Sequence, residues 1–192
     1  MNGQEQGGME FNPAQFFDSL YRVGRELLLR PRLFYRQVPT TAPVRGPLAF
    51  LCTMSFLAAL CIANYRAAGF QVFVVLMASN VCAAAAASLL LHGIAVKLCR
   101  SGAGIGATFR IIAYASIVDV LSWIPTIGLV PYCYGLYLIF IGLQELHRMS
   151  ARQAALALTA IIAAITLVFG SLLVLAPESV QEGIKLLDPQ RS

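Results

Sequence analysis

Residues 70–96 read FQVFVVLMASNVCAAAAASLLLHGIAV and contain no Lys, Arg, Asp or Glu. About 20 consecutive apolar residues suffice for an α-helix to cross the roughly 30 Å hydrocarbon core of a bilayer. Backbone amides in lipid must form hydrogen bonds within their own segment, which favours a helix over any open structure. The stretch is therefore predicted to be a transmembrane helix.

The rest of the chain agrees with this membrane assignment. Of 192 residues, 58% are hydrophobic and 12% are charged, and the mean hydropathy is +0.73. A soluble domain carries about 25% charged residues. Composition therefore excludes a water-soluble globule, a disordered chain, a collagen and a disulfide-rich secreted protein. The five cysteines show no metal-binding spacing and are interpreted as small hydrophobic residues.

Four further apolar stretches complete an all-α, integral membrane bundle of five transmembrane helices. The third and fourth are joined by Pro125-Thr126-Ile127-Gly128, which predicts a tight helical hairpin with Pro131 in the first turn of its second helix. The alternative is a re-entrant pair that never fully crosses. The four stretches are 46–63, 107–124, 129–146 and 154–175.

A two-faced helix is predicted before the first span. Asn12-Pro13 provides a cap and a first-turn proline, and residues 14–30 follow a helical pattern. With many charges and about 17 residues, this helix cannot span. It either lies in the interface with its aromatic face in lipid or packs on the bundle, and the two readings are compatible. Its apolar side comprises Phe16, Phe17, Leu20, Tyr21, Val23, Leu27 and Leu28.

The chain is divided into four parts on this basis. Residues 1–11 are predicted to be a disordered N-terminus, 12–45 a cytoplasmic amphipathic helix and basic linker, 46–175 the transmembrane domain, and 176–192 a short tail. Prolines in the linker predict that it is not helical and follows the membrane surface. The candidate lipid- or partner-binding residues of this region are Phe16, Phe17, Arg22, Arg25, Arg32 and Arg36.

Charge asymmetry predicts the orientation. The N-terminal segment has six Lys or Arg, and the loop after the fourth stretch has two. The loop after the second stretch is given three, Lys97, Arg100 and Arg110, the last of them at the start of the third stretch. This makes eleven, against three on the opposite side. Basic loops stay in the cytoplasm. We therefore expect a cytoplasmic N-terminus and an outside C-terminus, in a bacterial plasma (inner) membrane.

Apart from Glu145 at the very end of the fourth stretch, Asp119 is the one acidic residue within an apolar stretch. An ionised carboxylate in lipid is costly, so it should face the bundle or water. Either it takes part in a proton, ion or substrate path, or it is a capped carboxyl near the outer interface. The candidate intramembrane polar residues are Asp119, Ser116, Ser122, Asn80 and His92, with Tyr132 and Tyr134 on the neighbouring helix.

No catalytic or cofactor site is predicted. His92 and His147 are isolated in the sequence, so no metal site is expected, and His147 is interpreted as part of a solvated helix end. A single intramembrane carboxylate cannot form an aspartic-protease pair. The glycine run 102–106 lacks the strand and the Lys of nucleotide-binding loops. We expect no enzyme activity, cofactor or metal, and no nucleic-acid binding.

Small residues in the second and fifth stretches, such as Ala83–Ser88, allow close helix approach. Packing within the chain is the default interpretation, and a homodimer face is the alternative.

An ordered set of short motifs resembles the Yip1-domain membrane proteins. The likeness covers about residues 27–175. The motifs are Pro31-Arg32-x-Phe34-Tyr35, Pro47, Gly106-x-Thr108-Phe109-Arg110, Tyr114-Ala115-Ser116, Ile124-Pro125-x-Ile127-Gly128, Ile141-Gly142-Leu143-x-Glu145-x-His147-x-x-Ser150 and Gln153-Ala154.

The resemblance implies a five-helix bundle with a cytoplasmic N-terminus and a non-catalytic role. Eukaryotic members resemble adaptors that bind Rab-type GTPases and one another. This chain lacks their N-terminal Asp-Leu-Tyr-Gly-Pro element, so GTPase recruitment is not expected. We expect a membrane scaffold that binds lipids, itself or a cytoplasmic protein partner. The alternative is a small transporter, channel or lipid-translocating protein with Asp119 in a polar path.

Overall fold

The computed structural model describes residues 9–40, 42–65, 69–122, 124 and 128–175, without the side chains of 122, 169, 170 and 172–175. All regular secondary structure within these ranges is helical. The predicted all-α class is therefore confirmed. Of the predicted disordered N-terminus (1–11), residues 1–8 lie outside the described residues, as does the whole predicted tail (176–192).

Two helices form the N-terminal arm, which comprises residues 9–38. A 3-10 turn (η1, Pro13–Gln15) is capped by the Asn12 side chain and leads into α1 (Phe16–Leu29). The next helix, α2 (Pro31–Gln37), begins with a proline at its first position, where the missing N–H removes no helical hydrogen bond. The prediction of a non-helical linker is thus wrong for residues 31–37, because Pro31 starts a helix rather than breaking one.

Four helices are long and apolar enough to cross a membrane. They are α3 (Arg45–Tyr65), α4 (Phe70–Cys99), α7 (Leu129–Leu146) and α8 (Ala151–Leu175), the last with a candidate span over Ala151–Val168. The protein is therefore an integral membrane protein with about four spans. These helices correspond to four of the five apolar stretches.

The third predicted span is not a continuous helix. It consists of α5 (Ile105–Ala115), a 3-10 turn (η2, Ser116–Val118) and α6 (Asp119–Ser122). The Ser116 hydroxyl donates to the Ala113 carbonyl at 2.7 Å, a local bond that competes with regular helical bonding at this point. The expectation of a fifth unbroken transmembrane helix is therefore wrong for this stretch.

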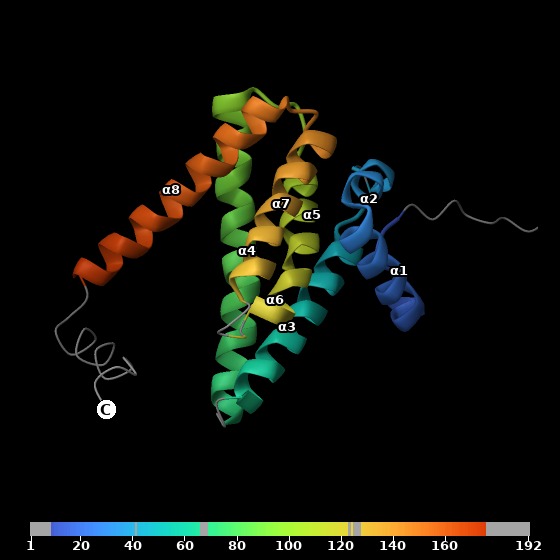
Figure 1. The fold of residues 1–192 in the computed structure, drawn as a ribbon, viewed down its shortest axis with the longest axis vertical. Helices are drawn as coiled ribbons and strands as arrows, with labels where there is room; N and C mark the ends of the chain where they lie inside the picture. Colours follow the sequence, from blue (N-terminus) through green and yellow to red (C-terminus); the bar gives the residue numbers. More distant parts are fainter. Residues whose placement is uncertain (1–8, 41, 66–68, 123, 125–127, 176–192) are drawn as a thin grey trace, which may run out of the picture.

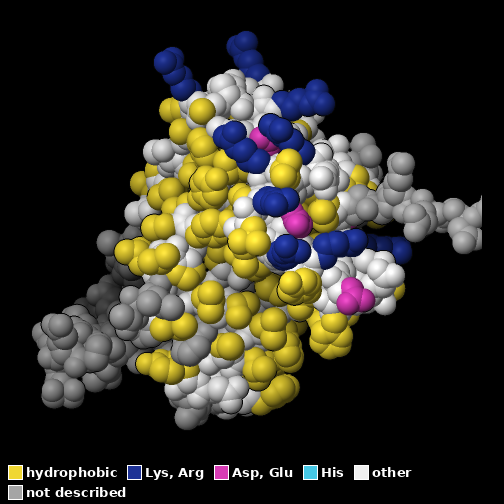
Figure 2. All heavy atoms as spheres, turned by 45° about the vertical axis from the view of Figure 1, so that its right-hand side comes forward, with side chains coloured by type: hydrophobic (Ala, Val, Ile, Leu, Met, Phe, Trp, Pro, Cys, Tyr) yellow, Lys and Arg dark blue, Asp and Glu magenta, His cyan; other side chains and the backbone are white. Residues whose placement is uncertain are grey.

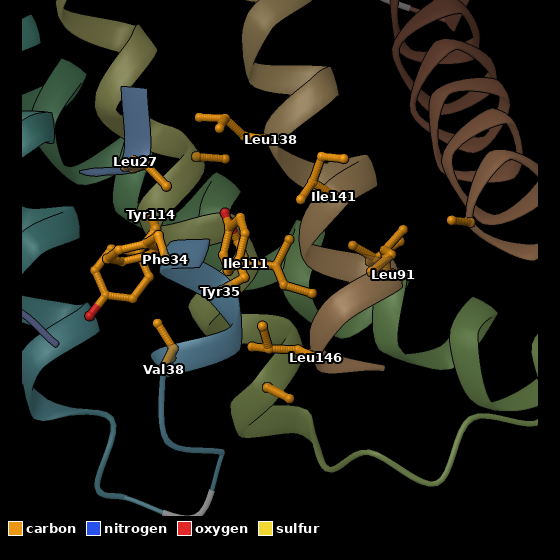
Figure 3. Packing of buried hydrophobic residues seen from close by; sticks show 14 of the residues in the cluster. Leu27, Phe34, Tyr35, Val38, Leu91, Ile111, Tyr114, Leu138, Ile141 and Leu146 are labelled. Atoms are coloured by element: carbon orange, nitrogen blue, oxygen red, sulfur yellow. The ribbon is translucent and has the colours of Figure 1, made fainter. Parts of the chain in front are cut away.

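In Figure 1, α4 forms the long axis of the bundle, with α5 and α7 beside it and α3 crossing toward its start. The arm packs on the right side of the bundle in this view, and α8 leaves the bundle on the left after its first turns. Buried residues from α1, α2, α4, α5 and α7 meet in one apolar core (Figure 3). The core therefore joins the arm to the membrane helices.

Two glycines bring α7 against α5 and η2. A Cβ at Gly142 would lie 2.8 Å from Cγ1 of Ile111, and one at Gly135 would lie 2.8 Å from Cγ2 of Val118. Real Cβ atoms do not approach so closely, so both positions require glycine. The paired residues run in opposite directions, which makes α5 and α7 an antiparallel hairpin.

Contacts along α3 fix the depth of this hairpin. Phe50 packs on Tyr114, and Asn80 bonds to both Ser55 and Asp119. Residues of α3 and of the α5–α6 segment that lie at the same height are therefore 64 positions apart in the sequence, and the two segments run parallel. Ser55 is the central residue of α3. Asp119 therefore lies at mid-depth. Ser122, the last residue of α6, lies at the height of Ala58 in α3. Beyond this height α3 continues for seven residues, or about 10 Å at 1.5 Å per residue.

Charge is distributed unevenly over the surface. Figure 2 shows Lys and Arg side chains gathered over the upper end and right flank of this face, whereas hydrophobic side chains cover its lower half. Such a division is typical of a protein whose basic end contacts water or phosphate headgroups and whose apolar part contacts lipid.

Candidate functional site

The outward side of α1 presents apolar and basic side chains together. Ser19, Val23 and Leu27 face the bundle and are buried. The exposed fractions are 81% for Phe17 and 71% for Tyr21. We call Phe17, Tyr21 and Leu28 the exposed strip; Arg22 and Arg25, also exposed, flank it.

The apolar side predicted for α1 is thus divided between two environments. Leu27 and Val23 pack on the bundle, while the exposed strip does not. Phe16 stands between them, with its ring 5.7 Å from the ring of Phe11 and 5.2 Å from that of Phe17. The two readings of this helix, packing and lipid contact, use different residues of it.

A buried arginine holds the arm to the bundle. Arg110 in α5 is 0% exposed, and its Nε donates to Oε1 of Glu10 at 2.7 Å. Its other nitrogens donate to the carbonyls of Gly106, Ala42 and Pro43. The guanidinium therefore clamps to α5 both the start of the arm, at Glu10, and the chain that follows the arm, at Ala42 and Pro43. The predicted disorder of residues 1–11 is wrong for residues 9–11, because Glu10 makes this pair and Phe11 is buried.

Two tyrosines fasten the chain before α1 and the last turn of α1. The buried Tyr114 hydroxyl accepts a hydrogen bond from the Phe11 amide at 3.2 Å. The Tyr134 hydroxyl donates to the carbonyl of Leu28 at 2.7 Å, at the last turn of α1. Since the chain just before α1 and the last turn of α1 are both held, the direction of the exposed strip is fixed relative to the bundle.

The two arginines of α2 bond to the polar end of α7. Arg36 forms an ion pair with Glu145, with Nε 2.9 Å from Oε2, and Arg32 donates to the side-chain carbonyl of Gln144 at 3.1 Å. The Arg36 side chain remains 61% exposed. Lipid or partner binding by these arginines stays a prediction, and their placement differs from that of Arg22 and Arg25.

A polar group lies inside the bundle at mid-depth. Nδ2 of Asn80 in α4 donates to Oδ2 of Asp119 at 3.3 Å and to Oγ of Ser55 at 3.0 Å. The two readings of Asp119, a polar path and a capped carboxyl near the outer interface, stay predictions, and its level at the centre of α3 weighs against the second. Three helices thus contribute to one hydrogen-bonded group.

Asn80 and Asp119 lie at one side of a groove of about 590 Å³ between α4, the α5–α7 hairpin and α8. Ala83, Ala87, Ile139 and Ile165 are among the residues that line it, and most of its wall is apolar. Such a volume falls within the range of about 300–1,000 Å³ that is usual for small-molecule sites.

The predicted intramembrane residues do not all meet there. Ser116 lines the groove, but its hydroxyl donates to its own helix. The side chain of Ser122 is outside the described part of the chain. His92 lies 12 residues from Asn80 along α4, about 18 Å away at 1.5 Å per residue. The predicted set is therefore split between two places.

His92 belongs to a second polar group near the loop after α7. Its Nδ1 lies 3.2 Å from Oγ1 of Thr108, which lies 2.9 Å from Nε2 of His147. Nδ1 of His147 lies 2.8 Å from Oγ of Ser101. The expectation of isolated histidines is wrong, because the antiparallel packing of α4, α5 and α7 brings them to one threonine.

His147 is not a solvated helix end either, since it is 6% exposed. Burial, and secondarily the charge of His92, lowers the pKa of the His147 imidazole from 6.5 to about 4. The ring is therefore neutral at physiological pH and bonds as one donor and one acceptor. In the described part of the chain, no three His, Cys, Asp or Glu side chains gather as a metal site would require.

A family model for the Yip1 domain matches residues 25–173. This chain belongs to the Yip1 domain family. The match runs from the last residues of α1 to α8, and it confirms the resemblance seen in the motifs. No curated protein and no solved structure matches the chain.

The structure gives physical roles to the residues of the Yip1-type motifs. Arg110 clamps the arm, Gly142 allows helix contact, and Thr108 joins the two histidines. Phe17 and Arg22 precede the matched range. The matched range therefore includes Arg110, whereas its partner Glu10 and the first half of α1 precede it.

Proposed function

We propose that this Yip1-domain protein is a non-catalytic membrane scaffold or adaptor. It binds lipid, further copies of itself or a protein partner through the arm and the cytoplasmic loops. The observation that carries this proposal is the exposed strip on α1, beside Arg22 and Arg25, on a helix clamped to the bundle at its other side. A rigidly held amphipathic helix suits a fixed contact with a membrane surface.

The same proposal gives the orientation. The N-terminus is cytoplasmic and the C-terminus lies outside a bacterial plasma membrane, as the Lys and Arg distribution supports. Arg45 at the start of α3 is level with Phe109, next to the Arg110 clamp, which puts the polar end of the bundle at the cytoplasmic headgroups.

Five segments enter the bilayer in this account, but α5–α6 and α7 form a hairpin that ends within it. From Ile105 to Ser122 the first segment of this pair is about 26 Å long at 1.5 Å per residue, against the roughly 30 Å of the hydrocarbon core, and its described part ends about 10 Å before α3 does. The re-entrant alternative for this pair is therefore the one we propose. α3, α4 and α8 cross completely, which leaves the two termini on opposite sides.

The energetics favour an interfacial α1. A fully buried Phe or Leu side chain contributes about 1.5–3 kcal/mol, and partial entry of the exposed strip contributes part of this for each residue. Each Arg near an anionic surface adds about 1 kcal/mol. Burial of the exposed strip and attraction of the arginines to the surface add up. The strip should therefore enter lipid most strongly when the lipid is anionic.

Fluorescence quenching in the whole chain tests this proposal. Phe17→Trp, in a background with Trp123→Phe, is placed in nanodiscs that contain lipids brominated near the headgroup. We expect strong quenching that increases with the anionic lipid fraction. Asp18→Trp, one residue further on the polar side of α1, is the matched control and should be quenched weakly. Equal quenching at positions 17 and 18 would contradict the proposal.

A second candidate is a small transporter, channel or lipid-translocating protein, which the presence of Asp119 in the groove favours. If Asp119 lies in such a path, Asp119→Asn changes the flux, or its pH dependence, in liposomes. An unchanged flux removes this role from Asp119. The distance of His92 from the groove weighs against the full predicted path.

A further inference from the structure

Two arginines at one end of the bundle have a backbone conformation that favours glycine. The φ angle is 51° at Arg100, the cap of α4, and 53° at Arg148, the second residue after α7. Among the described residues, these are the two with positive φ. The left-handed conformation is unfavourable for a residue with a Cβ, and helices that end in this way usually have glycine there. Arginine at both positions therefore indicates that its side chain has a use.

Nothing in the described part of the chain uses these two side chains. Both are exposed, and neither Arg100 nor Arg148 makes a hydrogen bond or ion pair with another described residue. Backbone bonds close the helix ends instead, as from the Ser101 amide to the Ala95 carbonyl at 3.1 Å. A cation near a helix C-terminus is favourable, but one in the last turn gives this without a left-handed backbone. The two guanidinium groups are therefore available to a ligand from outside the chain.

A hydrogen bond between the two helix ends brings the arginines near each other. Oγ of Ser101, the residue after Arg100, lies 2.8 Å from Nδ1 of His147, the residue before Arg148. Because His147 is buried, this bond lies beneath the surface that carries the arginines. The two positions are thus held by one fixed contact, as a binding site requires.

Two further cations flank this pair. Lys97 in the last turn of α4 and Arg152 in the first turn of α8 are both exposed. The Cys99 thiol donates to the carbonyl of the residue after Arg152 at 3.5 Å, so the two turns lie side by side at the top of the bundle (Figure 1). Residues 96–104 and 146–153 contain no Asp or Glu. We call the four cations the basic cluster: Lys97, Arg100, Arg148 and Arg152.

Exposed apolar side chains lie next to the basic cluster. Leu98 is 64% exposed, and Leu156, one turn along α8 from Arg152, is 63% exposed. Cations beside apolar side chains at the end of membrane-crossing helices are typical of the headgroup level (Figure 2). A ligand with both anionic groups and acyl chains matches both features, whereas a water-soluble anion matches the cations alone.

We propose that the basic cluster binds one phospholipid that carries two phosphate groups. The two cations at the end of α4 bind one phosphate, the two on either side of the start of α8 bind the other, and acyl chains cover the exposed leucines. Guanidinium groups form bidentate hydrogen bonds with phosphate oxygens, which suits a cluster made mainly of arginine. The positive end of the α8 dipole adds to the attraction. This inference rests on the lipid binding by cytoplasmic loops proposed above, and it names the lipid.

The test uses the whole protein in a neutral detergent, with bound lipid measured by native mass spectrometry. Cardiolipin has two phosphates, phosphatidylglycerol has one, and phosphatidylcholine has no net charge. We expect cardiolipin to bind about tenfold more tightly than phosphatidylglycerol, because its second phosphate adds charge-assisted hydrogen bonds. Bis(glycerophospho)glycerol, the water-soluble headgroup of cardiolipin, should bind at least about tenfold more weakly than cardiolipin, because it buries no acyl chain.

Two substitutions at Arg100 separate ligand binding from a role in the fold. Arg100→Gly removes the side chain and relaxes the backbone. It should weaken cardiolipin binding about fivefold or more and raise the melting temperature of the lipid-free protein by about 2–4 °C. Arg100→Gln keeps the Cβ, so it should weaken binding equally without that rise.

Two more variants complete the set. Arg148→Gly should behave as Arg100→Gly does, with weaker cardiolipin binding and a higher melting temperature. Arg30→Gln is the matched control, because it removes an equally exposed arginine outside the basic cluster. It should change neither the affinity for cardiolipin nor the melting temperature.

Three results would overturn the proposal. Equal affinities for cardiolipin and phosphatidylglycerol mean that the basic cluster attracts any negative surface. An Arg100→Gly variant that melts lower and binds cardiolipin normally means that the arginine serves the helix end. A soluble headgroup that binds as tightly as cardiolipin means that the ligand is a water-soluble phosphate compound. Quenching at position 17 reports on α1 alone, so each of these failures is distinct from a failure of the proposed function.

Discussion

The guanidinium of Arg110 and the carboxylate of Glu10 form an ion pair 2.7 Å long between residues 100 positions apart in the chain. The Arg110 side chain is 1% exposed, whereas that of Glu10 is 17% exposed. A charge this deeply buried is stable only when it is paired and hydrogen-bonded. The attachment of the arm to the Yip1 domain therefore depends on Glu10 and on the carbonyls beside it.

Arg110→Gln should release the arm. Loss of one partner of a buried ion pair costs about 3–5 kcal/mol, and here it also removes bonds to Ala42 and Pro43. We expect a lower free energy of unfolding in mixed micelles and faster tryptic cleavage after Arg22 and Arg25. Arg25→Gln, an exposed arginine of the arm, is the control and should leave stability unchanged. Equal stability of Arg110→Gln and the unaltered protein would contradict the clamp.

Gly142→Ala should separate α7 from α5. The added methyl group would lie 2.8 Å from Ile111, and overpacking of this kind costs about 1–3 kcal/mol. Gly93→Ala is a matched control, because nothing lies within 4 Å of its Cβ position in α4. There we expect a gain of up to about 1 kcal/mol from helix propensity. Similar melting temperatures for the two variants would argue against close α5–α7 contact.

Hydropathy predicted the four long helices correctly. It failed at the third stretch, where a local hydrogen bond accompanies a break in the helix. The stretches for α3, α4, α7 and α8 are continuous, so length and composition identify them. The third stretch is also mainly apolar, but the Ser116 hydroxyl bonds to Ala113 and the helix changes to a 3-10 turn. Hydropathy averages over windows and does not register one such bond.

The candidate sites were predicted only in part, because contacts between distant residues have no signal in one sequence. The two-faced pattern of α1 is visible in its 3.6-residue spacing, but the division between Val23 and Phe17 depends on where the bundle lies. Arg110 was counted as a loop charge, although a charge five residues into an apolar helix was a sign of a buried partner. Thr108, which joins His92 to His147, had no distinguishing feature.

Stability should fall as the pH is lowered from about 6.5 toward 4. The pKa of His147 is about 4 in the folded protein and 6.5 when unfolded, so the unfolded chain binds the proton first in this window. The loss is about 1–3 kcal/mol, since each unit of pKa difference is worth 1.36 kcal/mol and part of it is screened. Melting temperature in detergent, recorded across this range, measures it.

His147→Gln should flatten that pH profile. Glutamine retains a donor and an acceptor toward Ser101 and Thr108 but does not titrate. The melting temperature of this variant at pH 7 should stay near that of the unaltered protein. A profile as steep as before would show that another group governs the acid sensitivity.

Cysteine accessibility tests the central claim, the arrangement of the Yip1 domain in the membrane, most directly. In a chain whose five native cysteines are replaced, Arg152→Cys, Ser179→Cys and Val130→Cys are each treated in intact cells with a membrane-impermeant maleimide, before and after permeabilisation. We predict that position 179 reacts from outside, that position 152 reacts only after permeabilisation, and that position 130 reacts in neither case, because a thiol in hydrocarbon does not ionise. Reaction of position 152 in intact cells would contradict the orientation, and reaction of position 130 from outside would contradict a hairpin that ends within the bilayer.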